Sequence, residues 1–123
     1  MRRGTPEYEA AQEAMTDILL ERARSWDRRI SYSELSQLMA SGGHNVPPHS
    51  AEMYFLLADV SRQESPNGTK AMLSAMVVFK DPNKQEPGAG FYRLAREEFG
   101  HTGDNLSIWI KELEYLERDY GQR

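Results

Sequence analysis

The stretch "KAMLSAMVVFKDPNKQEPGAGFYRLAREEFG" (residues 70–100) decides the fold that the sequence predicts. Its first ten residues are apolar on both faces of an extended chain, so we expect a strand over 70–79 that is covered on both sides. A polar loop follows over 80–89, and "GFY" (90–92) has the length of a short return strand. The stretch therefore predicts a β-hairpin, followed by a short helix over 93–100 that Gly100 ends.

The Gly-x-Gly at 88–90 could belong to a loop that cradles a phosphate or to a simple turn. A dinucleotide-binding loop needs a third glycine three residues later and a strand directly before it. Here Arg93 stands at the third position, the strand ends well upstream, and Glu86 would repel a phosphate. We therefore interpret residues 86–89 as a type II turn, in which Gly88 takes a positive φ.

Apolar residues at helical spacing predict further helices over residues 6–25, 32–40, 51–64 and 105–120. The residues expected to cap them are Thr5, Ser31, Ser50 and Asp104. The most definite start is "ISYSEL" (30–35), where Ser31 and Glu34 have the spacing of a capping box. Ile30, directly before this cap, can add a very short strand.

Three helices followed by a hairpin is the element order of a winged helix. Through "SYSEL" and "LSAMVV…PGAGFY", residues 28–100 resemble an uncharacterised group of small bacterial and phage winged-helix-like proteins. The resemblance implies a fold and no particular activity. We expect one mostly helical α+β domain over 1–123, with a winged-helix-like three-helix core and a β-hairpin wing. Two helices follow the wing, and the last forms a C-terminal extension over about 104–120.

The composition limits the class of protein. The chain has 123 residues, a formal net charge of −4, and no cysteine, which excludes disulfides, thiolate metal sites and cysteine nucleophiles. The N-terminal "MRRGTPEYEA" is not followed by the apolar region of a signal peptide, and no apolar run approaches the roughly 18 residues of a membrane span. We expect a cytoplasmic protein without a membrane partner.

A DNA-binding transcriptional regulator is the alternative function that the element order suggests. In that case helix 51–64 and the wing over 80–89 would contact the duplex. The nucleic-acid contacts would be Arg62, Lys80, Lys84 and Arg93. Nearby acidic residues nearly cancel these charges, and phosphate neutralisation supplies most non-specific affinity, so the charge pattern supports this alternative weakly.

A cluster of arginines at the end of the first helix is the most basic segment. It comprises Arg22, Arg24, Arg28 and Arg29. The cluster can form a nucleic-acid patch or can pair with carboxylates in the same region. We favour ion pairing, with Glu21, Asp17 or Asp27 as partners.

The sequence contains no arrangement typical of a catalytic, cofactor or metal site. His44 and His49 share a loop and His101 lies far away in sequence, which is short of a metal-ligand set. The serines near Ser31 lack the G-x-S-x-G pattern of a nucleophile elbow. We therefore expect no enzyme activity, no cofactor and no small-molecule substrate.

The function that we favour is a non-catalytic protein–protein interaction module, which either binds another protein or forms a homodimer. The apolar stripe on the last predicted helix is the expected interface. Its candidate residues are Trp109, Leu113, Leu116 and Tyr120.

Overall fold

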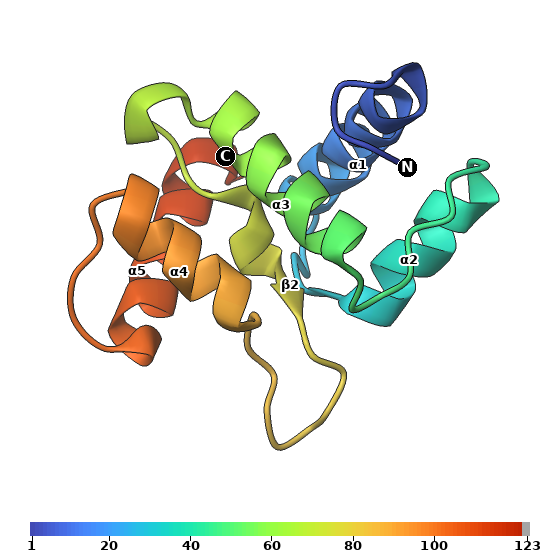
Figure 1. The fold of residues 1–123 in the computed structure, drawn as a ribbon. Helices are drawn as coiled ribbons and strands as arrows, with labels where there is room; N and C mark the ends of the chain where they lie inside the picture. Colours follow the sequence, from blue (N-terminus) through green and yellow to red (C-terminus); the bar gives the residue numbers. More distant parts are fainter. Residues whose placement is uncertain (122–123) are drawn as a thin grey trace.

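Five α-helices dominate the computed structural model, which describes residues 1–121 (Figure 1). They are α1 (Pro6–Ala23), α2 (Tyr32–Ser41), α3 (Ala51–Glu64), α4 (Ala89–Glu98) and α5 (Asn105–Tyr120). Two short 3₁₀ helices, η1 (Pro66–Gly68) and η2 (Leu73–Met76), and two strands, β1 (Ile30–Ser31) and β2 (Val77–Val78), complete the described chain. The strands pair in parallel, with Ile30 opposite Val77 and Ser31 opposite Val78.

The predicted caps of α1, α2, α3 and α5 are confirmed. In each case a side-chain oxygen accepts a hydrogen bond from the backbone N–H three residues later, for example Ser31 Oγ from Glu34 at 3.0 Å. This bond pairs one of the N–H groups that a helix start leaves free. These four helix starts therefore follow from local sequence, and β1, which leads directly into α2, confirms the expected short strand at Ile30.

The predicted β-hairpin, and with it the winged-helix-like fold class, is wrong. Residues 70–79 do not form a strand, because η2 occupies their middle and only Val77–Val78 is extended in a sheet. The expected return strand over 90–92 lies in the first turns of α4, where Phe91, Leu94 and Ala95 are buried at helical spacing. The structure of residues 1–121 is mostly helical, with one two-stranded parallel sheet.

The hairpin fails because side chains, rather than a neighbouring strand, pair much of the backbone of the segment 71–78 before Val77–Val78, which pairs with β1. Every residue of this segment is buried, so its polar backbone groups need partners. The N–H groups of Ala71 and Met72 donate to Asp119 and Glu112 at 2.8 Å each. Further along, Trp109 donates its indole N–H to the Ala75 carbonyl at 2.9 Å. We call residues 71–78 the buried segment.

The predicted type II turn is also wrong. Gly88 has φ −75° and ψ 175°, and it is the residue directly before the first turn of α4. Its N–H donates to the Tyr32 hydroxyl at 2.8 Å, which holds the start of α4 against the start of α2. The loop before it closes through one backbone hydrogen bond, from Phe79 N–H to the Glu86 carbonyl at 3.0 Å. In Figure 1 this loop projects from the body below β2.

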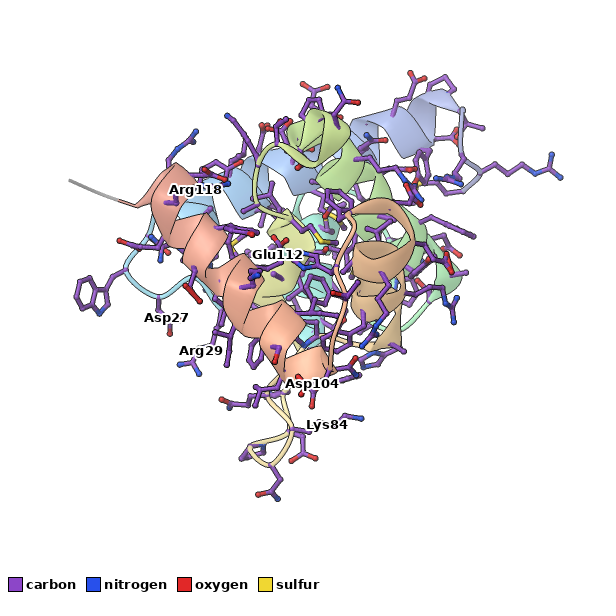
Figure 2. All side chains as sticks on the ribbon, turned by 90° about the vertical axis from the view of Figure 1, so that its left-hand side faces the viewer. Asp27, Arg29, Lys84, Asp104, Glu112 and Arg118 are labelled. Atoms are coloured by element: carbon purple, nitrogen blue, oxygen red, sulfur yellow. The ribbon has the colours of Figure 1, made fainter. Side chains whose placement is uncertain are left out.

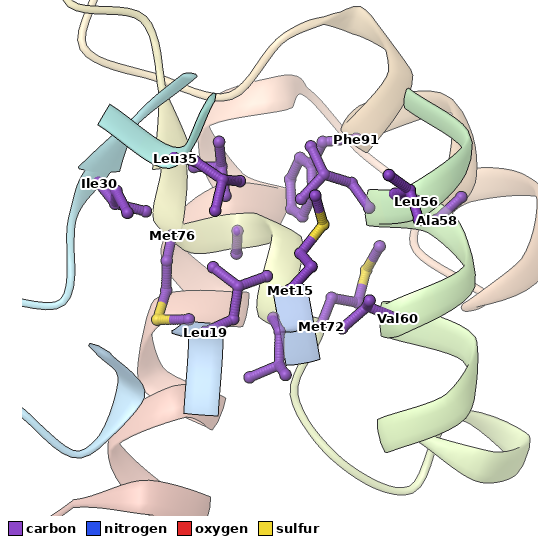
Figure 3. Close-up of a cluster of buried hydrophobic side chains, with 14 of the residues drawn as sticks. Met15, Leu19, Ile30, Leu35, Leu56, Ala58, Val60, Met72, Met76 and Phe91 are labelled. Atoms are coloured by element: carbon purple, nitrogen blue, oxygen red, sulfur yellow. The ribbon is translucent and has the colours of Figure 1, made fainter. Parts of the chain in front are cut away.

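The hydrophobic core surrounds the buried segment (Figure 3). Met15 and Leu19 of α1 lie on one side of it, and Leu56 and Val60 of α3 lie on another, all of them inaccessible to solvent. Among residues 1–121, no helix has the length and apolarity that crossing a membrane requires.

Candidate functional site

Of the four residues proposed to contact nucleic acid, Arg62 is already paired with carboxylates of the same chain. Its guanidinium binds Glu98 through two hydrogen bonds of 2.6 and 2.7 Å and Asp59 through one of 2.8 Å. Lys80 and Lys84 are exposed on the projecting loop, and Arg93 is exposed on α4; Figure 2 shows Lys84 near the tip of that loop. Because Arg62 is neutralised, α3 offers the duplex no free cation at this position.

The arginine cluster forms ion pairs, as expected, although two of the partners differ. Arg29 pairs with Asp27 at 3.5 Å. Arg22 pairs with Glu34 at 2.6 Å, and Arg28 pairs with Glu117 at 2.7 Å. The two unexpected partners lie on other elements, Glu34 on α2 and Glu117 on α5, so spacing within the cluster could not reveal them.

The proposed interface residues on α5 pack within the chain. Leu116 is inaccessible, Tyr120 is 9% exposed, and Trp109 and Leu113 pack against the same core. The apolar side chains that α5 does expose are Leu106 and Ile110, at 62% and 46%. The stripe thus packs within the chain's own core.

A pocket of about 170 Å³, which we call the apolar pocket, opens between the starts of α2, α3 and α4. Its walls are mostly apolar and aromatic, and they include Tyr32, His49, Met53, Tyr54, Leu57, Ala58, Phe79, Phe91 and Leu94. Three of these side chains pack on one another. The Tyr32 ring centre lies 5.3 Å from both His49 and Phe79, and the His49 and Phe79 ring centres are 5.8 Å apart.

Two glycines let the walls of the apolar pocket approach so closely. A Cβ on Gly90 would lie 2.4 Å from the Tyr54 ring, and a Cβ on Gly88 would lie 3.0 Å from the Tyr32 hydroxyl. Gly90 is the second residue of α4, and a glycine loses more conformational freedom there than alanine would. Its place there is explained by the Tyr54 ring that packs directly against its Cα.

Tyr32 gives the apolar pocket a polar group. Burial raises the pKa of the Tyr32 hydroxyl, and the hydrogen bond from Gly88 N–H only partly opposes this effect. The hydroxyl is therefore neutral at physiological pH and keeps its proton for donation. The described residues include no acceptor for that proton, so an acceptor on a ligand can take it.

Sequence reasoning missed this site. It did not single out Tyr32, and it treated His49 only as part of a loop. The one local signal was Gly90, at the start of "GFYRLA", because a glycine beside an apolar pattern can mark a place where another part of the chain approaches closely. No residues within 1–121 form a group of three or more His, Asp or Glu side chains able to hold a metal ion.

Comparison of the chain with protein-family models, with curated proteins and with solved structures found no match.

Proposed function

We propose that the protein is a non-catalytic interaction module that binds a partner protein by anchoring one apolar side chain in the apolar pocket. The size of the pocket carries this proposal. Its 170 Å³ is close to the roughly 150 Å³ of a cavity that accepts benzene, and below the roughly 300 Å³ at which sites for drug-sized ligands begin. One aromatic or branched aliphatic side chain fills it.

The polar groups of the pocket suit a polypeptide. A buried aromatic anchor supplies much of the affinity of a protein interface, while polar contacts at its edge fix orientation. The Tyr32 hydroxyl can donate to a carbonyl beside the anchor. His49, for which the described contacts include ring packing alone, adds an imidazole that can exchange hydrogen bonds with the partner backbone. The cysteine-free chain suits the cytoplasm, which we propose as the compartment.

The first test is an NMR titration of the full chain with N-acetyl-phenylalanine amide, a capped single residue. We expect saturable shifts at residues that line the apolar pocket. In Ala58→Leu, the added side chain enters the pocket from α3 and should abolish them. Ala40→Leu makes the same change at an exposed position of α2 and should leave them intact. Equal shifts in the two variants would contradict the proposal.

The second test is selection of binding peptides from a random library. We expect one position to be restricted to aromatic or large aliphatic residues, and binding to be lost in Ala58→Leu. Selected peptides without such a position would count against a side-chain anchor. Sedimentation of the free chain separates the self-binding case, because a dimer that Ala58→Leu dissociates would identify a second copy as the partner.

A further inference from the structure

A second cavity, of about 330 Å³, differs from the apolar pocket in its lining, which is mostly polar. It opens between the turn after η1, the loop that joins α4 to α5, and α5 itself. Its lining includes Lys70, His101, Thr102, Ser107, Lys111 and Arg118. It shares no residue with the apolar pocket, and we call it the cationic cavity.

A buried histidine–glutamate pair forms part of its wall. His101 Nε2 lies 2.5 Å from Glu112 Oε2, and the two side chains are 9% and 3% exposed. The other carboxylate oxygen of Glu112 accepts the Met72 N–H at 2.8 Å. Figure 2 shows Glu112 midway along α5, between Asp104 at its start and Arg118 near its end. Glu112 is therefore fixed from two sides and in turn fixes the ring of His101.

The backbone before His101 holds the ring in place as well. Gly100 has φ +71°, a conformation that glycine adopts without strain. It turns the chain back at the end of α4, so that the His101 N–H donates to the Ala95 carbonyl at 3.1 Å. The histidine is thus positioned by α4 through its backbone and by α5 through its side chain.

The second ring nitrogen of His101 is left for the cavity. Nε2 is taken by Glu112, and no hydrogen bond to Nδ1 occurs among the described residues. Those residues contain no buried side-chain nitrogen or oxygen without a partner, so Nδ1 must be accessible to solvent. Because the rest of the side chain is buried, the accessible edge is the one that lines the cationic cavity.

The charge of the lining is opposite to that of the whole chain. Lys70, Lys111 and Arg118 face a single carboxylate, Glu112, whereas the chain carries a formal charge of −4. Arg118 is also engaged by Asp119 and stacks on Tyr115 at 4.5 Å. Within residues 1–121 neither Lys70 nor Lys111 has an ion-pair partner, and both are exposed, so their charges remain for a ligand.

We propose that the cationic cavity binds a small molecule through its phosphate or carboxylate group, which Lys70 and Lys111 contact beside the accessible edge of the His101 ring. This goes beyond the proposed interaction function and uses different residues. The hydroxyls of Thr102 and Ser107 line the same cavity and can donate to further oxygens of the anion. The volume leaves room for a small organic body beyond the anionic group.

NMR titration of the full chain with inorganic phosphate, and separately with acetate, tests the site and separates the two anion classes. We expect saturable shifts around Lys70, His101 and Lys111 with at least one of them. Lys70→Glu and Lys111→Glu should each weaken binding at least tenfold. Lys80→Glu makes the same charge change on the projecting loop and should alter the affinity less than twofold. Equal weakening in all three variants, or a Kd above about 10 mM for both anions, would overturn the proposal.

His101→Gln tests the histidine, because it keeps a hydrogen-bonding side chain and removes the imidazole edge from the cavity wall. Anion binding should weaken at least threefold, and an unchanged affinity in folded His101→Gln would show that His101 takes no part in binding. If this variant does not fold, the titrations of Lys70→Glu and Lys111→Glu decide the proposal.

Discussion

The start of α2 and the buried segment are neighbours in space, since β1 pairs with β2, yet they form for opposite reasons. The start of α2 is satisfied by its own residues, because Ser31 accepts the Glu34 N–H three positions away. The buried segment before β2 draws its hydrogen-bond partners mainly from α5, more than thirty positions away, and one from Ser61 of α3. The comparison teaches that a polar backbone group needs a partner in either case, and that only the near partner leaves a sequence pattern.

The largest loss of stability is expected when the hydrogen bonds from α5 to the buried segment are removed. Glu112→Ala removes the partner of both the Met72 N–H and His101, so the free energy of unfolding should fall by about 3 kcal/mol. Urea denaturation measures it. Glu114→Ala, an exposed position on the same helix, should change it by less than about 0.5 kcal/mol. Similar values for the two variants would show that α5 does not hold the segment.

A smaller loss of stability is expected when the hydrogen bond from the Trp109 indole to the buried segment is removed. Trp109→Phe keeps an aromatic ring but leaves the Ala75 carbonyl without its donor, which should cost about 2 kcal/mol. Trp26→Phe is the matched control, because Trp26 is fully exposed. Thermal unfolding of both variants compares them, and a control as destabilised as Trp109→Phe would contradict the assignment.

The local hydrogen bond at the start of α2 should contribute less to the free energy of unfolding. Ser31→Ala removes the cap of α2 and should lower the free energy of unfolding by about 1 kcal/mol. Ser33→Ala, two residues further into the helix, should leave it nearly unchanged. If Ser31→Ala cost more than Glu112→Ala, the ranking of distant over local support would be reversed.

The smallest effect concerns a surface network that also joins distant residues. Burial would raise the pKa of Asp59, but hydrogen bonds from Arg3 and Tyr8 outweigh burial and lower it. A lowered folded pKa means that this carboxylate stabilises the fold above the unfolded pKa and that the stabilisation is lost as pH falls through the folded pKa.

For Asp59, this window begins at about pH 4 and extends downward. The stability difference between the wild type and Asp59→Asn should therefore be constant near neutral pH and shrink below about pH 4, by less than about 1 kcal/mol. Denaturation at several pH values measures it. Asp17→Asn, at an exposed position of α1, serves as the control, and an equal pH dependence in both variants would exclude the Asp59 network as its cause.

The helices were predictable to a large extent, and the sites were not. Four capped helices and the short strand at Ile30 follow from spacing and caps within a few residues. The apolar pocket brings together Tyr32, His49 and Phe79, which belong to three separate segments. The His101–Glu112 pair spans eleven positions and a loop whose path Gly100 sets. No spacing rule joins such residues, because their distance depends on how the helices pack.

By itself, the sequence determined where four of the five α-helices of residues 1–121 begin, since each of these caps and its N–H partner lie within one turn; the start of α4, which has no side-chain cap, was not predicted. It also determined that the residues around 71–78 are buried, since an apolar run has no other stable place. Tertiary structure alone decided the conformation of that run and the chemistry of both cavities. A buried backbone group pairs with whichever partner the packing brings near it, and in the residues before β2 this partner is Asp119, Glu112 or Trp109 of α5 rather than a second strand.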